Sequence, residues 1–532
     1  MPHAKSFAIC RRDRRCSERD AEFLRCRGLA GRREEREPRL EPADKRHERN
    51  QAERKPTEQM HRSNLIIVFL FFLFQFLAVL LTVYFLTRAA ATLFHRQEPW
   101  ASLVAPVLLI AASLVYIARG PARWLLLLST AMTLATAMFF ERIRRSPLRS
   151  RFALPLVTAG IMVNAIVFAI ARLELDGRAF MFSGVPVATC LAVALLIDVY
   201  RGEAPGVTDP LAPLLYLVQF PVLPAGPIVR YRDFSRSHLR LEEGVSLGAF
   251  TYGMRRLVIG LVKLLLVAAP LGGAVDEIFA LPPARVGAAA AWLAAISFAL
   301  QVYFQFSGYA DLAIGIGRML GFRYPENFRR PYVADSVREF WRRWNITAIT
   351  WLRDYLSLPI AGRDRPTPRL FVNAVIGFCL VGLWHGAGSN VAGWAIYSAA
   401  WLALEAIGLG RRLERWPAVA RHFYVLVVAV AGWVFLRADT TGHALSFLGV
   451  MMTGGGRTAA PLSAFLTPAL LMVLCVAIAG AGPMVPGISR WRVALDALTA
   501  SIVMMATSVP LFVWRVRTLV NQALAPFRKR NM

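Results

Sequence analysis

The sequence predicts an all-α membrane protein with about eleven transmembrane helices, and two observations support that prediction. Hydrophobic residues make up 56% of the 532 residues, and the mean hydropathy is +0.45, well above the level of an ordinary globular domain. The apolar residues gather in long runs, several of which approach or exceed the roughly 18–20 residues that cross a bilayer as a helix. Because a helix satisfies its own backbone hydrogen bonds in lipid, whereas a loop does not, these runs are interpreted as spanning helices.

The clearest run is 65–86, with the sequence LIIVFLFFLFQFLAVLLTVYFL. Shorter runs near 211–225 and 443–452 have the length of half-helices. The other runs are expected to form the remaining spans and lie near 101–118, 122–140, 152–171, 180–199, 249–268, 288–306, 371–384, 391–408, 422–436, 464–482 and 493–515.

The net charge is +28, from 62 Lys and Arg against 34 Asp and Glu. In a soluble protein this excess would suggest nucleic-acid binding, but here the basic residues concentrate in tails and loops beside apolar runs. That placement is typical of the positive-inside bias and of contacts with anionic lipid headgroups. We therefore expect membrane lipids, and no nucleic acid, as partners. The six cysteines show no CxxC or Cys/His spacing, so neither a metal site nor a structural disulfide is expected.

Residues 1–63 differ from the rest of the chain, because they are rich in Arg and Glu and have little apolar periodicity. They are expected to form a disordered tail, and they do not have the pattern of a signal peptide. Met60 directly precedes HRSNLIIVFLFFLF, and a chain beginning there would look like a normal membrane protein. Met60 is therefore interpreted as the natural start. Residues 64–532 are predicted to form one membrane domain.

Of the eight histidines, only His385 lies at the seam between two long apolar runs. Gly386, Ala387 and Gly388 follow it, and these small residues would let a backbone or a substrate approach the imidazole closely. Ionisable groups inside a membrane are costly and usually functional. A neutral imidazole at that depth can accept a proton from a hydroxyl as a general base. The alternative is a histidine that only hydrogen bonds between helices.

The segment 334–366, ADSVREFWRRWNITAITWLRDYLSLPIAGRDRP, is predicted to form one amphipathic helix at a membrane interface, ended by Pro359 and Gly362. Its apolar residues form one stripe on a helix, and its charged residues lie off that stripe. Asn345 falls inside the stripe, where it either joins helices by a hydrogen bond or points into a site. The stripe contains Val337, Trp341, Trp344, Ala348, Leu352 and Tyr355; the charged residues are Glu339, Arg342, Arg343, Arg353 and Asp354.

Three prolines and Gly226 interrupt the apolar run in FPVLPAGPIVRYRDF, residues 220–234. This pattern predicts a re-entrant or interfacial turn followed by a basic loop. Non-helical backbone at membrane depth is tolerated only against protein or a watery cavity. The alternative is a plain loop after a span.

The segment 305–332 contains the small residues Ala313, Gly315 and Gly317, which suggest close helix packing. Asp311 in the same segment is either a site carboxylate or the cap of a following helix. Of these two interpretations, the cap is slightly favoured.

Taken together, four segments resemble the membrane-bound O-acyltransferase superfamily, and in particular its bacterial polysaccharide branch, the alginate O-acetylation membrane proteins. In the family order, the segments are PAGPIVRY (224–231), SGYADLAIGIGRMLGFRYPENFRRPY (307–332), EFWRRWNITAITWLRDYLSLPIAG (339–362) and GLWHGA (382–387). The resemblance covers roughly 65–490. In most alginate-type relatives a second histidine follows the WRRW motif. Asn345 stands at that position here, as asparagine commonly does in branches that acylate lipids, sterols or peptides.

The resemblance implies tilted helices around a central funnel in a bacterial inner membrane. It implies transfer of an acyl group, in this branch acetyl, from a cytosolic thioester such as acetyl-CoA toward a hydroxyl acceptor. His385 corresponds to the signature histidine and would act as the base, and Asn345 would donate to the developing oxyanion. A periplasmic acetyltransferase- or esterase-like partner would complete the transfer to an exported polysaccharide such as alginate.

The same motifs supply candidates for donor or substrate binding. Their arginines would attract donor phosphates, or would contact lipid headgroups instead. The candidates are Arg342, Trp344, Arg353, Asp354, Trp384 and Asp311.

The sequence also leaves other reaction routes, acceptors and functions open. No GxSxG elbow or Ser-His-Asp triad is evident, which favours direct transfer, although a histidine-linked acyl intermediate stays open. The acceptor could instead be lipid-linked or a small molecule. A proton-coupled transporter using His385 is the alternative from another class, but it would predict broken helices in two matching halves, and no matching halves are evident in the sequence.

Overall fold

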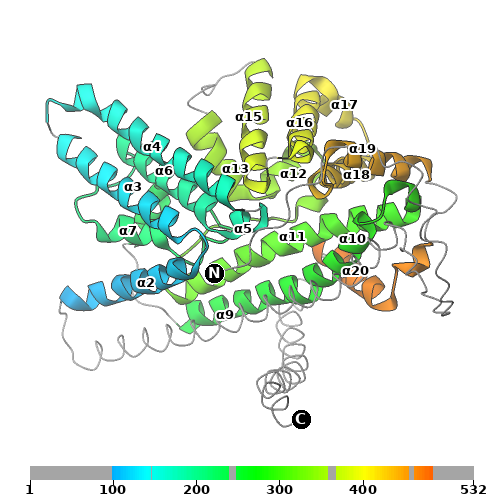
Figure 1. Ribbon diagram of the computed structural model, residues 1–532, viewed down its shortest axis with the longest axis horizontal. Coiled ribbons are helices and arrows are strands. Elements are labelled where there is room, and N and C mark those ends of the chain that lie inside the picture. The colour runs from blue at the N-terminus through cyan, green and yellow to red at the C-terminus, as the bar shows by residue number, and fades with distance from the viewer. Residues whose placement is uncertain are drawn as a thin grey trace, which may run out of the picture. The chain divides into compact units, whose positions relative to one another are not determined.

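The computed structural model describes residues 99–144, 146–175, 177–238, 247–357, 367–386, 388–454 and 461–482. Over these ranges the chain consists of helices joined by turns and short loops, without a β-strand, which confirms the all-α class (Figure 1). The apolar runs 65–86 and 493–515 lie outside the described residues, as do the expected boundary at residue 63 and the expected start at Met60.

The helices before the middle of the chain are α2 (Pro99–Arg119), α3 (Arg123–Arg144), α4 (Arg149–Glu174), α5 (Gly177–Phe182), α6 (Val185–Arg201), α7 (Leu211–Val218), α8 (Tyr231–His238), α9 (Leu247–Val262) and α10 (Ala269–Phe279). Those that follow are α11 (Ala288–Met319), α12 (Val337–Arg343), α13 (Ile346–Leu352), α15 (Thr367–His385), α16 (Ser389–Leu404), α17 (Gly410–Leu413), α18 (Ala418–Arg437), α19 (Thr441–Thr453) and α20 (Pro468–Ala481). Three π-helical segments, Lys263–Ala268, Arg353–Ser357 and Glu405–Leu409, continue α9, α13 and α16.

Six helices in the described part of the chain are long and apolar enough to cross a membrane, and three shorter apolar helices accompany them. They correspond to the predicted runs from 101–118 to 464–482, with one exception. The run 180–199 is broken at Gly184, whose φ of 86° lies in the left-handed region and separates α5 from α6. The six are Arg123–Arg144, Arg151–Glu174, Gly248–Phe279, Ala288–Met319, Ser389–Leu413 and Ala418–Arg437, and the shorter three are Pro106–Arg119, Val375–His385 and Pro468–Ala481.

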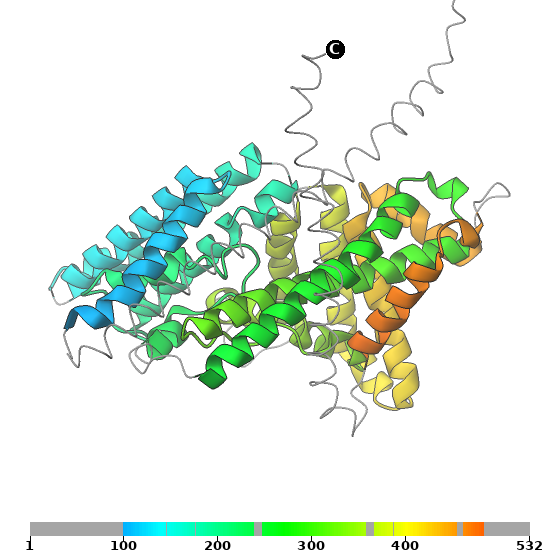
Figure 2. The ribbon, with the colours of Figure 1, turned by 90° about the horizontal axis from the view of Figure 1, so that it is seen from below.

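Helices α9 and α11 lie side by side (Figures 1 and 2) because glycines let their backbones approach. A Cβ atom on Gly253 would lie 2.6 Å from the carbonyl oxygen of Gly315, and one on Gly260 would lie 2.8 Å from that of Gly308. The predicted close packing at Gly315 is therefore confirmed. Gly317 faces Tyr324 instead, which fills the space where a Cβ would be.

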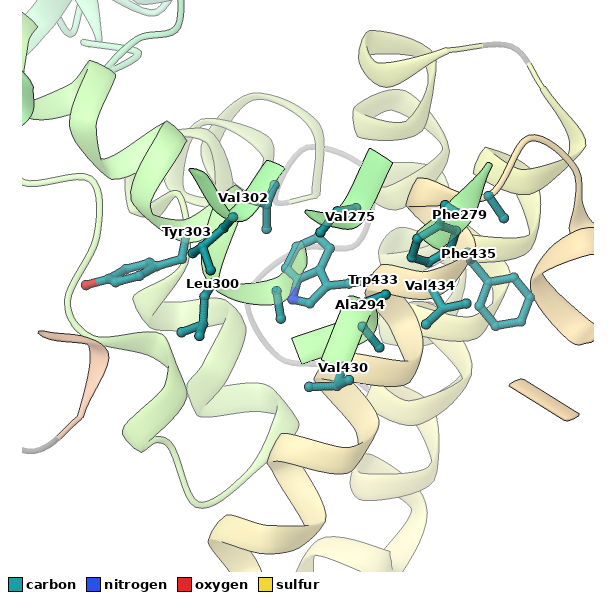
Figure 3. Close-up of a cluster of buried hydrophobic side chains, with 14 of the residues drawn as sticks. Val275, Phe279, Ala294, Leu300, Val302, Tyr303, Val430, Trp433, Val434 and Phe435 are labelled. Carbon is teal, nitrogen blue, oxygen red and sulfur yellow. The ribbon is translucent and has the colours of Figure 1, made fainter. Parts of the chain in front are cut away.

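A large cluster of buried apolar side chains joins α10, α11, α16, α18 and α19. Figure 3 shows part of it, with Val275 and Phe279 from α10 close to side chains of α11 and α18. Trp433 of α18 is 3% exposed and lies in this cluster. The cluster fixes α18 against α11, and both helices contribute residues to the site described below.

The segment between α7 and α8 is non-helical and largely buried, as the prolines in 220–234 predicted. Protein groups satisfy its backbone: the Ile228 N–H donates to Thr347 Oγ1 over 2.9 Å, and the Tyr216 hydroxyl donates to the Val229 carbonyl over 2.7 Å. The prediction of a basic loop after this turn was wrong. Residues Tyr231–His238 form helix α8, and ion pairs from Arg230 and Arg232 to the buried Asp354 carboxylate hold the start of this helix against the protein.

Candidate active site

His385 is the last residue of α15, and α16 begins four residues later at Ser389, so the predicted seam is confirmed. The two helices pack closely, since a Cβ on Gly382 would lie 2.8 Å from Val391 Cγ1. The imidazole lies beside two aromatic rings, with centroids 6.0 Å from Phe306 and 6.1 Å from Trp394. Among the described residues, no hydrogen bond ties the imidazole to Phe306, to the Trp394 indole N–H or to any other group.

Asn345 separates α12 from α13, and the prediction of one continuous helix over 334–366 was therefore wrong. Its backbone has φ 43° and ψ 54°, the left-handed conformation, and Trp344 before it is extended. That conformation costs an ordinary residue roughly 1–2 kcal/mol and is more accessible to asparagine. The sequence pattern does not reveal this break. One left-handed residue interrupts the helix, but the apolar residues before and after it still repeat at about 100° per residue. The predicted end at Pro359 and Gly362 lies outside the described residues.

Local sequence explains where α12 begins. Ser336 caps the helix by accepting a hydrogen bond from the Glu339 N–H over 3.1 Å. The buried carboxylate of Glu405 accepts hydrogen bonds from the next two backbone amides, Val337 N at 2.7 Å and Arg338 N at 3.0 Å. These hydrogen bonds anchor the first turn of α12 and so fix the positions of Trp341 within the helix and of Trp344 directly after it.

His385 and Asn345 line the same cavity, although 40 residues separate them in the sequence. The empty space measures about 1040 Å³, including its open mouth. Helices α11, α12, α13, α15, α16 and α18 all contribute to its wall. The lining residues are mostly aliphatic and aromatic, with His385, Asn345 and Arg353 as the other polar residues, a composition typical of a small-molecule site.

Four tryptophans form the aromatic side of the cavity, and their rings pack on one another. The ring centroids of Trp344 and Trp433 are 4.7 Å apart, and those of Trp341 and Trp394 are 5.9 Å apart. Phe378 of α15 lies 4.9 Å from Trp341. Such mutual packing makes this side of the cavity rigid, because moving one ring requires its neighbours to move.

Two of the binding candidates, Trp344 and Arg353, also line the cavity. The Nε of Arg353 donates to Asp354 Oδ1 over 2.8 Å, which orients the guanidinium. Asp354 itself does not reach the cavity. It is buried beside α8, where it also accepts hydrogen bonds from Arg230 and, over 2.7 Å, from Arg232.

The remaining three candidates lie away from the cavity wall. Arg342 is exposed and pairs with Glu339 at 3.3 Å, and Trp384 is not among the lining residues. Asp311 lies within α11, so the cap interpretation was wrong. Its buried carboxylate pairs with Arg256 at 2.5 Å and with Lys263 at 2.7 Å, and thereby ties α11 to α9 and the π-helical turn after it.

Several lining residues carry no signal in the sequence pattern. Val302, Phe306, Phe378, Trp394 and Trp433 line the cavity from four helices, but apolar residues facing a cavity have the same pattern as those facing lipid. Within the described ranges, no group of three His, Cys, Asp or Glu side chains has the spacing of a metal site.

The part of the chain that forms this cavity is similar to known proteins. The model of the membrane-bound O-acyltransferase family matches residues 181–435, a range that contains His385, Asn345 and every other residue lining the cavity except Leu436. The chain belongs to this family, and it is therefore a membrane-embedded acyltransferase.

By their names, relatives that the chain resembles O-acetylate alginate or peptidoglycan. The chain is 33% identical over 394 residues to the probable alginate O-acetylase AlgI of Pseudomonas fluorescens, covering 72% of this chain and 75% of the relative. It is 32% identical to the probable alginate O-acetylase AlgI of Azotobacter vinelandii, covering 74% and 79%. It is 31% identical to the peptidoglycan O-acetyltransferase of Helicobacter pylori, covering 47% and 48%.

Proposed function

We propose that this protein moves an acetyl group from a thioester donor, acetyl-CoA, toward the hydroxyls of an exported polysaccharide such as alginate, in a bacterial inner membrane. The names of the relatives support an acetyl group and a polysaccharide acceptor. The observation that carries the proposal is the one cavity that both His385 and Asn345 line.

The chemistry assigned to these residues is direct acyl transfer. An imidazole nitrogen of His385 accepts the proton of the acceptor hydroxyl while the hydroxyl oxygen bonds to the thioester carbonyl carbon. The carbonyl electron pair moves onto oxygen, and the Asn345 NH₂ group donates a hydrogen bond to that oxyanion. When the carbonyl re-forms, the carbon–sulfur bond breaks, and the departing thiolate takes the proton from His385. The apolar wall excludes bulk water and so strengthens both interactions.

Arg353 is the cationic group of the cavity, and we propose that it faces a phosphate of the donor. The hydrogen bond from its Nε to Asp354 leaves both terminal NH₂ groups available for an anion. Transfer to a polysaccharide outside the membrane would require a periplasmic acetyltransferase- or esterase-like partner. The exposed Arg342 would contact lipid headgroups instead.

The test compares His385→Ala, Asn345→Ala and the unchanged protein at equal abundance in membranes that retain the periplasmic partner, with acetyl-CoA as donor and alginate oligosaccharide as acceptor. Loss of the base should lower turnover by about 10²–10⁴-fold, and loss of the oxyanion donor by about 10²–10³-fold. Undiminished ester formation in both variants would refute the assignment. Acetylation of a lipid extract in place of the oligosaccharide would favour the lipid-linked acceptor.

A further inference from the structure

The backbone on both sides of Asn345 is hydrogen bonded to one other segment, residues 327–329. Before Asn345, the Arg329 N–H donates to the Arg343 carbonyl over 3.0 Å. After it, the Ile346 N–H donates to the Asn327 carbonyl over 2.9 Å. The left-handed residue is therefore enclosed between two fixed contacts.

Side chains add a second set of contacts on the α13 side. Asn327 Oδ1 accepts from the Thr347 N–H over 3.1 Å and from the Thr347 hydroxyl over 2.8 Å. The same hydroxyl oxygen accepts from the Ile228 N–H over 2.9 Å. Thr347 thus joins three separate segments, and both it and Asn327 are buried, with 6% and 2% exposure.

The Asn345 carboxamide takes no part in these contacts. Its side chain makes no capping hydrogen bond to α13, and within the described ranges no residue hydrogen bonds to it. It is nevertheless part of the cavity wall. Its left-handed backbone is held by its neighbours, which leaves the carboxamide available to a ligand. Besides Asn345, one other described non-glycine residue has positive φ. It is Arg330, which directly follows the hydrogen-bonded residue Arg329.

We propose that Thr347 and Asn327 are positioning residues that hold Asn345 in the left-handed conformation and so aim its carboxamide into the cavity. This inference rests on the proposed function, because it assigns them an effect on the step that Asn345 serves. It predicts a loss of turnover instead of a loss of donor binding, since neither side chain lines the cavity.

The test compares Thr347→Val, which removes the hydroxyl and keeps the shape, with Thr347→Ser, which keeps the hydroxyl. Thr350→Val is the matched control, because it lies on the same helix and its hydroxyl has no hydrogen-bond partner among the described residues. In the same membranes, with acetyl-CoA and alginate oligosaccharide, we expect T347V to lower kcat by between about 10-fold and 10²-fold with KM for acetyl-CoA nearly unchanged. T347S and T350V should stay close to the unchanged protein.

Combining T347V with a substitution of Asn345 tests more directly whether Thr347 acts through Asn345. Added to Asn345→Ala, T347V should lower the residual turnover no further, because the group it positions is gone. An equal fold-loss in both backgrounds, or an unchanged kcat in T347V, would overturn the inference. If N345A abolished turnover while T347V left it unchanged, only the inference would fail; full activity of N345A would instead remove the proposed role of Asn345. Should T347V not accumulate, T347A replaces it with the same two outcomes.

Discussion

The guanidinium of Arg232 and the carboxylate of Asp354 meet at 2.7 Å, and this ion pair connects α8 to the segment that carries Arg353 into the cavity. Arg230 binds the same carboxylate oxygen, and Arg353 binds the other one. The Asp354 side chain is 7% exposed, while those of its three arginine partners are 19–59% exposed. The buried Asp354 carboxylate therefore holds three arginine side chains in place.

Asp354→Asn should destabilise the protein and also lower turnover, because Arg353 loses the group that orients it. Breaking a fully buried ion pair costs roughly 3–5 kcal/mol, and less is expected here because the arginines keep contact with water. Thermal unfolding of the protein in detergent would measure the change. Asp233→Asn is the control, since its side chain is 40% exposed and, among the described residues, pairs with Arg230 alone; an equal loss in both variants would contradict the prediction.

The same carboxylate predicts a pH dependence. Burial raises the pKa of Asp354, but the hydrogen bonds from Arg353 and Arg230 outweigh that effect and leave its pKa lowered. A lowered folded-state pKa stabilises the protein above the unfolded-state pKa of about 3.9, and that contribution is lost as the pH falls below it. The difference in melting temperature between the unchanged protein and D354N should therefore be constant from about pH 5 to 8 and shrink below about pH 4. A difference that grew on acidification would have the wrong sign.

Substitutions at Asn345 should separate its backbone role from its chemical role. Asn345→Gly keeps the left-handed backbone but removes the carboxamide, so we expect normal abundance with turnover lowered about 10²–10³-fold. Asn345→Val should reduce abundance as well, because a β-branched residue is strained at positive φ. Asn345→His should retain part of the activity, since histidine tolerates this backbone region and its ring N–H can donate. Western blotting of membranes measures abundance, and an acetyl-transfer assay measures turnover. Normal abundance of the valine variant would show that the left-handed backbone is not required.

Gly260→Ala tests the packing of α9 on α11. The added Cβ would lie 2.8 Å from the Gly308 carbonyl oxygen and 3.0 Å from Leu312 N. Both are backbone atoms, so the helices must separate, and we expect a loss of roughly 1–3 kcal/mol with reduced abundance. Gly248→Ala is the matched control on α9, because nothing lies within 4 Å of its added Cβ. Equal abundance of the two variants would contradict the predicted close contact.

The all-α class and most of the spans followed from the sequence, because the bilayer requires long uninterrupted apolar runs and the sequence displays them directly. His385 was identified in the same way, since an ionisable residue between two such runs is conspicuous. Asn345 stands out as a polar residue in an apolar stripe, but the periodicity predicts a helix that continues through it. Periodicity records which residues are apolar and not the φ angle of a single residue.

Tertiary structure alone decided which residues share the cavity. Trp394, Trp433 and Phe306 come from three helices far apart in the chain, and only packing brings them beside His385 and Asn345. It also decided that Asp311 and Asp354 serve ion pairs between segments, because the partner of a buried charge is fixed by which helices meet. The sequence by itself determined that this chain crosses a membrane and which histidine is exceptional. The conformation of Asn345 depends on hydrogen bonds from a segment some 18 residues away, Asn327 to Arg329, and such non-local contacts exist only in the folded protein.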